Sequence, residues 1–149
     1  MKKKPFMIFS FMFLILSCGG DESSTNEVVL PQNPTIITDK TSISFDDTMV
    51  SKSSAASSIL IESKNVDSSL NISSSDGFEI SFNNLDFSNS LTIEANQSKT
   101  IYVRFSPSKI QTYNGNINIQ NTQATDVKIN LSGEGIQLKY NYKTFSKKR

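Results

Sequence analysis

The stretch Ile93–Pro107, IEANQSKTIYVRFSP, decides the fold. Between Thr100 and Phe105 apolar and polar side chains alternate, which places Ile101 and Val103 on the same side of the segment as Phe105. In a β-strand successive side chains point to opposite faces of the sheet, so this alternation predicts a strand with one buried face. The residues just before it include Asn and Ser, which are typical of a turn.

The same alternation recurs on both sides of this stretch. Clear runs follow at 115–120 and 127–132, and weaker runs precede or adjoin it at 42–45, 58–61, 70–73, 78–82 and 91–95. Ser, Asn, Asp and Gly separate these runs, and no helical period occurs after the first 17 residues. The pattern predicts an all-β protein, an antiparallel sandwich or barrel of about seven strands.

In the sandwich, the apolar positions of the runs would form two facing layers about 10 Å apart, without a disulfide. The predicted core consists of Phe45, Ile59, Ile61, Leu70, Ile72, Phe78, Ile80, Ile101, Val103, Phe105, Ile117, Ile119, Val127, Ile129 and Leu131. The polar positions between them would lie on the outer faces, among them Tyr102, Arg104, Asn116, Asn118, Lys128 and Asn130. Such residues can bind a partner, and they are also what any solvated sheet face needs.

The order and spacing of these runs resemble a known family. Residues 93–107 are similar to the segment "L-x-P-G-x-S-x-x-I-x-V-x-F-x-P" of choice-of-anchor D and ASH-type (abnormal-spindle and hydin-like) immunoglobulin-like domains. Tyr113–Ile119 matches their "Y-x-G-x-L-x-I", and Leu131–Gly135 matches their closing "L-S-G-x-G". Upstream, Ile43–Phe45 resembles the opening "L-x-F" and Leu70–Ser73 the "L-x-I-x" strand. The resemblance covers Thr41 to Ile136 and implies an immunoglobulin-like sandwich that serves as an interaction or spacer module.

The chain departs from the family pattern at two turns. The family's "T-N-T-G" turn is here Ser63–Val66, which requires a different turn or a shifted register. The glycine before the fifth family strand is Asn96. Asparagine tolerates a positive φ better than most side chains, so Asn96 can keep the same turn.

Residues 1–17 have the layout of a secretory signal peptide. Lys2, Lys3 and Lys4 precede an apolar run, Pro5–Leu16, that ends at the small residue Ser17. The run is about a dozen residues long, whereas a transmembrane helix needs roughly 20. A cleaved signal peptide is therefore favoured over a permanent membrane span.

The single cysteine of the chain, Cys18, follows directly. Ile15-Leu16-Ser17-Cys18 resembles the lipobox of bacterial lipoproteins, in which the cysteine is acylated with diacylglycerol and becomes the first residue after cleavage. The alternative, a free or disulfide-forming cysteine, has no second cysteine in the chain as a partner. The resemblance implies a lipid anchor at Cys18, since two or more acyl chains hold a protein stably on a membrane.

Two acidic residues, Asp21 and Glu22, lie just after this cysteine. They resemble the surface-export signals of Bacteroidetes lipoproteins, a group with a similar Asn, Ser, Ile and Lys-rich composition; a solvated tether is the alternative. Residues 18–39 are polar and turn-prone, so they predict a flexible linker that holds a domain at 40–136 off the membrane. The expected location is the outer membrane, on its cell-surface or periplasmic face.

Composition argues against most enzymatic chemistry. The chain has no histidine and no tryptophan, and lipidation would consume its only thiol. The usual general base, the commonest metal ligand and the cysteine nucleophile are then missing, so we expect no cofactor and no metal site. Cleavage after residue 17 leaves 12 basic against 14 acidic residues, a net charge of −2, which gives no drive toward nucleic acid.

Two other clusters raise the question of a ligand. Asp46, Asp47 and Asp86 carry oxygens of the kind that calcium binds, but the spacing of a calcium loop is missing, and a turn between strands is favoured. Gly133-Glu134-Gly135 has part of a phosphate-binding loop without its third glycine or its strand-to-helix context. We expect these glycines to end a strand and allow the chain a sharp exit.

The last segment, residues 137–149, is basic and aromatic. Such residues can bind an anionic glycan or lipid headgroups. Alternatively, the apolar residues from Ile136 to Tyr142 prolong the last strand at a sheet edge, where lysines prevent aggregation. The residues concerned are Lys139, Tyr140, Tyr142, Lys143, Lys147, Lys148 and Arg149.

These observations predict a membrane-anchored cell-envelope lipoprotein without enzymatic activity. Its partners would be the membrane, through the lipid on Cys18, and a protein or glycan bound by the immunoglobulin-like domain. The alternative is a carbohydrate-binding accessory subunit or a small carboxylate-based hydrolase of the cell surface, which would need two carboxylates converging in a pocket.

Overall fold

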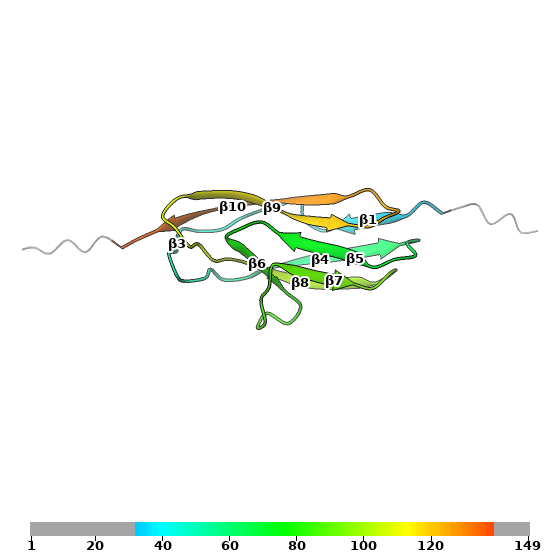
Figure 1. The fold of residues 1–149 in the computed structure, drawn as a ribbon, viewed down its shortest axis with the longest axis horizontal. Helices are drawn as coiled ribbons and strands as arrows, with labels where there is room; N and C mark the ends of the chain where they lie inside the picture. The colour runs from blue at the N-terminus through cyan, green and yellow to red at the C-terminus, as the bar shows by residue number, and fades with distance from the viewer. Residues whose placement is uncertain (1–31, 139–149) are drawn as a thin grey trace, which may run out of the picture. The chain divides into compact units, whose positions relative to one another are not determined.

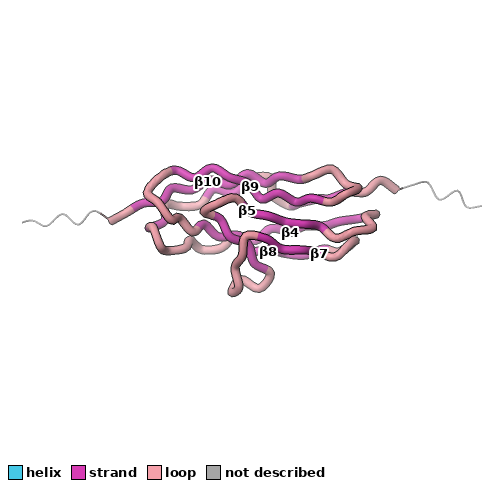
Figure 2. Tube along the Cα trace, viewed as in Figure 1, coloured by secondary structure: helices cyan, strands magenta, loops and turns pink. Residues whose placement is uncertain are grey.

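The computed structural model describes residues 32–138, which form strands and loops (Figures 1 and 2). Within this range no helix has the length and hydrophobicity that a bilayer crossing requires. The strands are β1 (Thr35–Thr38), β2 (Ser42–Ser44), β3 (Thr48–Met49), β4 (Ser57–Lys64), β5 (Leu70–Ser74), β6 (Phe78–Ser81), β7 (Ser90–Ile93), β8 (Ser98–Phe105), β9 (Thr112–Gln120) and β10 (Val127–Ile136).

The strands form two sheets that pack face to face as an immunoglobulin-like β-sandwich. One sheet has four strands in the order β1-β4-β8-β6, and the other has six, in the order β2-β10-β9-β5-β7 with β3 also paired to β10. The predicted all-β sandwich is confirmed. The described residues form ten strands rather than about seven, because three short strands precede β4.

The sequence predicted purely antiparallel sheets, but the six-stranded sheet also contains parallel pairs. β10 pairs in parallel with β2, where Leu131 lies opposite Ile43, and with β3, where Gly135 lies opposite Thr48. The backbone N–H of Phe45 also donates to Ser132 O, at 2.8 Å. Alternation of side chains is the same in both kinds of pairing, so it does not distinguish them.

The N-terminal part of the fold contributes to both sheets. β1 pairs with β4 and the next segment pairs with β10. Thr35–Thr38 was predicted as linker, and that prediction does not hold: these residues form a strand, and Ile36 packs against the core. The run TIIT is too short to show a period, and it has two adjacent isoleucines of which one points inward and one outward.

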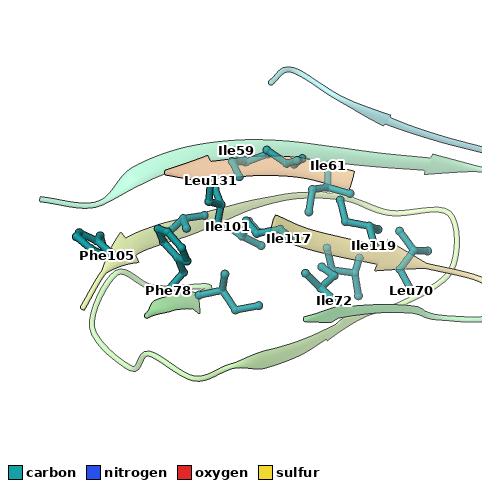
Figure 3. Close-up of a cluster of buried hydrophobic side chains, with 14 of the residues drawn as sticks. Ile59, Ile61, Leu70, Ile72, Phe78, Ile101, Phe105, Ile117, Ile119 and Leu131 are labelled. Atoms are coloured by element: carbon teal, nitrogen blue, oxygen red, sulfur yellow. The ribbon is translucent and has the colours of Figure 1, made fainter. Parts of the chain in front are cut away.

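The core lies between the sheets (Figure 3). All the predicted core residues are buried except Phe45 and Val127, which are half-buried and pack against the others. Val66, Ile93, Tyr113 and Ala124 complete the buried cluster. The alternation in the sequence therefore identifies the inward face of the strands correctly.

Four aromatic rings fill the end of the core where β10 finishes. The Phe105 ring centroid lies 5.2 Å from that of Phe78, 6.2 Å from that of Phe45 and 5.2 Å from that of Tyr113, the last edge to face. We call these four residues the aromatic cluster. Each such aromatic pair contributes roughly 0.5–1.5 kcal/mol to the stability of the fold, in addition to the contribution of the apolar area that it buries.

The aromatic cluster packs against glycines, and this corrects a prediction. Gly133 and Gly135 do not end β10 but lie buried within it. A Cβ on Gly133 would lie 2.8 Å from the Phe105 ring, and a Cβ on Gly135 would collide with the carbonyl oxygen of Lys109. The two glycines therefore allow a ring and a loop to approach the strand backbone closely.

The two turns that depart from the family pattern are joined to each other. Asn96 has a φ of 57°, as predicted, and Asn65 also has a positive φ, 58°. The Asn96 side-chain oxygen accepts the N–H of Val66 at 3.0 Å, and its amide donates to Val66 O at 2.8 Å. The altered family turn is thus a tight turn at Asn65, held by the side chain of the neighbouring turn.

We expect Gly133→Ala to destabilise the domain by about 1–3 kcal/mol, because the added methyl must displace the Phe105 ring from a filled core. Urea denaturation followed by circular dichroism measures this change. Lys128→Ala, an exposed change in the same strand, should stay within about 0.5 kcal/mol of the wild type. Equal stability of the two variants would contradict the packing role of Gly133.

Candidate interaction surfaces

Several predicted site residues lie outside the described range. These are Cys18, Asp21, Glu22, Lys139, Tyr140, Tyr142, Lys143, Lys147, Lys148 and Arg149. β10 ends at Ile136, so the strand does not extend to Leu138 as the edge-strand alternative requires. The lipid anchor and the ligand of the tail stay predictions.

The chain enters and leaves the sandwich at opposite ends. Thr35, at the start of β1, lies opposite Lys64 at the last position of β4, and we call this the proximal end. β10 finishes at the other end, where Ile136 lies opposite Met49, and we call this the distal end. Figure 1 shows β1 and the arrowhead of β10 at opposite sides of the sandwich.

A tyrosine closes the loop between β8 and β9 at the distal end. The Tyr113 hydroxyl accepts the backbone N–H of Ser108 at 3.1 Å and that of Lys109 at 2.9 Å. This arrangement is similar to the tyrosine corner of immunoglobulin folds, in which a tyrosine near the start of a strand binds backbone a few residues upstream. The ring of the same tyrosine belongs to the aromatic cluster, so the core and the loop are fixed by one side chain.

The distal end carries a partly apolar groove of about 710 Å³, which we call the distal groove. Its exposed apolar side chains are Met49 from β3, Ile110 from the loop between β8 and β9, and Leu138 beyond β10, with 38%, 60% and 53% of their surfaces accessible. Lys109 also lines it. Three segments far apart in the sequence form this groove, so no single run of residues predicts it.

The outer face of the six-stranded sheet has a different character, and we call it the amide face. Amide and hydroxyl side chains lie side by side across its strands: Asn71 is opposite both Thr92 and Gln120, and Asn116 is opposite Asn130. The amide face consists of the outward strand positions Ser42, Ser44, Asn71, Ser73, Ser90, Thr92, Thr112, Asn114, Asn116, Asn118, Gln120, Lys128, Asn130, Ser132 and Glu134.

Two hollows lie on the amide face. One, of about 350 Å³, is lined by the outward Ser44, Asn114 and Asn130 among others. The second, of about 380 Å³ at the proximal end, is lined by Asn71 and Gln120 together with residues of the adjoining loops. Both hollows are bounded mainly by uncharged groups that donate or accept hydrogen bonds.

The outer face of the four-stranded sheet carries charge and aromatic rings. Arg104 on β8 binds Glu79 on β6, with both its Nε and its Nη2 2.7 Å from Oε2. The Arg104 guanidinium also stacks over the Phe87 ring at 3.9 Å. At the edge of the core, Lys99, opposite the buried Ile61, lies 5.5 Å from the centre of the half-buried Phe82 ring. These contacts hold the loop between β6 and β7 against the sheet, so the two phenylalanine rings are engaged within the protein.

Five of the eleven carboxylates in the described range have a hydrogen-bond or ion-pair partner. Glu79 binds Arg104, and Asp86 accepts the side-chain amide of Asn83 at 2.8 Å. Asp46 and Asp47 lie between β2 and β3, which both pair in parallel with β10, so they occupy a break in this pairing and not the predicted turn between strands. Among residues 32–138, no three Asp, Glu, Cys or His side chains gather in a way that could hold a metal ion.

The sequence anticipated part of these surfaces. It placed Asn116, Asn118 and Asn130 on an outer face, from their alternation with buried residues. It missed that Asn71, Thr92 and Ser42 join the same face, because this depends on strand register. It also missed the distal groove and the hydroxyl role of Tyr113, for which the family motif around Tyr113 was the available signal.

Comparison with known families supports the fold described above. The family described as Cep192 domain 4 matches residues 33–136, from just before β1 to the end of β10. The chain belongs to this family. The match confirms the ASH-type immunoglobulin-like domain that the sequence motifs predicted, and it extends the domain to include β1.

Solved structures with related folds are distant from this Cep192-type domain. The ASH/PapD-like domain 7 of human CEP192 is 14% identical, with a TM-score of 0.45, covering 70% of this chain and 87% of that one. A GH5 xyloglucanase of Bacteroides ovatus is 14% identical, TM-score 0.46, covering 74% and 20%. The periplasmic chaperone SfaE is 12% identical, TM-score 0.42, covering 71% and 60%. No curated protein matches the chain. These similarities are too low to indicate function.

Removal of the Tyr113 hydroxyl tests its part in the fold. We expect Tyr113→Phe, which removes the acceptor of two backbone N–H groups, to lower the melting temperature by about 4–8 °C, the shift for a loss of about 1 kcal/mol in a domain of this size. Differential scanning calorimetry measures it. Tyr102→Phe, on the outer face of the four-stranded sheet, should melt like the wild type. Identical melting of both variants would contradict the hydroxyl's role.

We expect the Tyr113 hydroxyl to lose its proton at a lower pH than an ordinary tyrosine does. The hydrogen bond with the Ser108 side chain, helped by the amides of Lys109 and Ser108, outweighs burial and lowers the pKa of Tyr113 from 10.0. The lowered pKa stabilises the fold; this contribution is fully present above the pKa of an unfolded tyrosine and is lost as the pH falls through the folded value. Phenolate absorbance should show an early step that Tyr113→Phe lacks; an unchanged curve would contradict the shift.

Proposed function

We propose that the protein is a membrane-anchored cell-envelope lipoprotein whose immunoglobulin-like domain is a non-catalytic interaction module. The lipid on Cys18 holds it on the outer membrane, at the cell-surface or periplasmic face. The observation that carries the proposal is the arrangement of the two ends of the domain: the chain enters at the proximal end, and β10 leaves at the distal end.

This arrangement suits an N-terminal anchor. Residues 19–32 lie between Cys18 and the first residue that the family matches, and a chain of this length reaches at most roughly 50 Å when extended. The proximal end would face the membrane. Both outer sheet faces and the distal groove would then be accessible to a partner.

The non-catalytic part of the proposal is supported by the family and by the carboxylates. A hydrolase based on carboxylates needs two of them free to converge on a substrate. Here Asp67 binds Gln123, Asp126 binds Gln120, and Asp39 accepts the N–H of Leu60. These side chains stabilise turns and strand ends.

Anchoring is tested by fractionation of cells that express the full chain. We expect the wild type to incorporate radiolabelled palmitate and to sediment with membranes. Cys18→Ala should do neither, and Ser23→Ala, a nearby change outside the lipobox, should behave like the wild type. Unlabelled wild type, or release of wild type as complete as that of Cys18→Ala, would refute the anchor.

The leaflet is tested by protease treatment of intact cells, read by immunoblot beside an internal periplasmic marker. Loss of the wild-type signal with survival of the marker would place the domain on the cell surface, as the acidic residues Asp21 and Glu22 predict. Protection of the domain would place it in the periplasm and refute the export role of these two residues.

A further inference from the structure

The amide face differs from an ordinary solvated sheet face in its lack of charge. Among its strand positions only Lys128, opposite Asn118, and Glu134, opposite Thr112, carry charge. The outer face of the other sheet, which has four strands, has Glu62, Lys64, Glu79 and Arg104 at strand positions. One molecule therefore keeps charges on one face and excludes them from most of the other.

The hydrogen-bonding groups of the amide face are available to a ligand. On this face Gln120 donates a hydrogen bond to Asp126, and the Ser132 hydroxyl donates one to Ser44. Within residues 32–138, the side-chain amides of Asn71, Asn116, Asn118 and Asn130 have no protein partner. Each amide offers two donors and an acceptor. Strands lie about 4.8 Å apart and alternate residues roughly 6.6 Å apart, so these groups form a regular array.

We propose that the amide face binds a neutral polysaccharide chain. Sugar hydroxyls both donate and accept hydrogen bonds, as the amides and hydroxyls of this face do. Removing amides from water costs far less than removing charges, so an uncharged face suits an uncharged ligand. An anionic polymer would require lysines and arginines along the face. The two hollows, with Asn116 and Asn118 between them, form a track long enough for several sugar units.

The face is less suited to a protein partner. Protein interfaces are centred on aromatic, Met or Arg side chains that become fully buried. Between the row of Thr92 and the row of Ser44, the outward positions of these strands carry no such side chain. Without rings for stacking, the affinity of one domain would be low, and many copies on one membrane would supply avidity. The inference thus deepens the proposed function by naming the class of its partner.

The test is native gel electrophoresis of the full chain carrying Cys18→Ala, in gels containing dextran, galactomannan or arabinoxylan, with polygalacturonate as the anionic comparison. We expect at least one neutral polysaccharide to retard the protein. The double variant Asn118→Asp/Asn130→Asp keeps the shape of both side chains but adds charge and removes donors. It should raise the dissociation constant about tenfold or more, since each lost hydrogen bond contributes several-fold.

The matched control is Asn84→Asp/Gln111→Glu, which adds the same two charges at exposed loop positions. It should be retarded like the parent chain. If the face variant melts well below the parent, Asn118→Asp alone replaces it, because Asn118 lies opposite Lys128 and the new charge is paired. Retardation by none of the three neutral polysaccharides, by polygalacturonate alone, or equally in face and control variants would overturn the proposal. These gels contain no membrane, so their outcome is independent of the anchor.

Discussion

The packing of the aromatic cluster against glycine backbone is the constraint on which the rest of the structure depends. Phe78 and Phe105 come from the four-stranded sheet, Tyr113 comes from the six-stranded sheet, and Phe45 lies between β2 and β3. Their rings reach each other because Gly133, and Gly77 beside Tyr113, have no Cβ at the point of closest approach. The cluster therefore fixes how the sheets meet without a disulfide.

Contacts of the aromatic cluster also fix the loops of the distal end. Tyr113 binds two backbone amides of the loop between β8 and β9, and the carbonyl of Lys109 in that loop lies against Gly135 of β10. The segment after β3 adds a second connection, since the N–H of Ser54 donates to Phe105 O at 2.9 Å. The distal groove is the surface left between these three connected segments.

The sequence predicted the features that depend on alternation and missed those that depend on pairing. β8, β9 and β10 repeat the period of two over six residues or more, and their predicted inward residues are buried apart from the half-buried Val127. β1 and β3 are too short to show a period. The glycines of β10 were misassigned because glycine is used both to end a strand and to admit a close neighbour, and only the position of Phe105 distinguishes the two. The amide face was partly visible in Asn116, Asn118 and Asn130, but its extent depends on register.

The arrangement of β1 has a mechanical consequence. A membrane anchor and a ligand bound elsewhere on the domain would pull on the chain in opposite directions along the strands. β1 would then be loaded parallel to its length against β4, so that its hydrogen bonds, from Thr35 opposite Lys64 to Thr38 opposite Ile61, share the force rather than open one after another. The next strand, β2, is hydrogen-bonded to β10 of the six-stranded sheet. If the domain is tethered as we propose, it would resist shear at β1, the strand through which tension from the anchor would reach it.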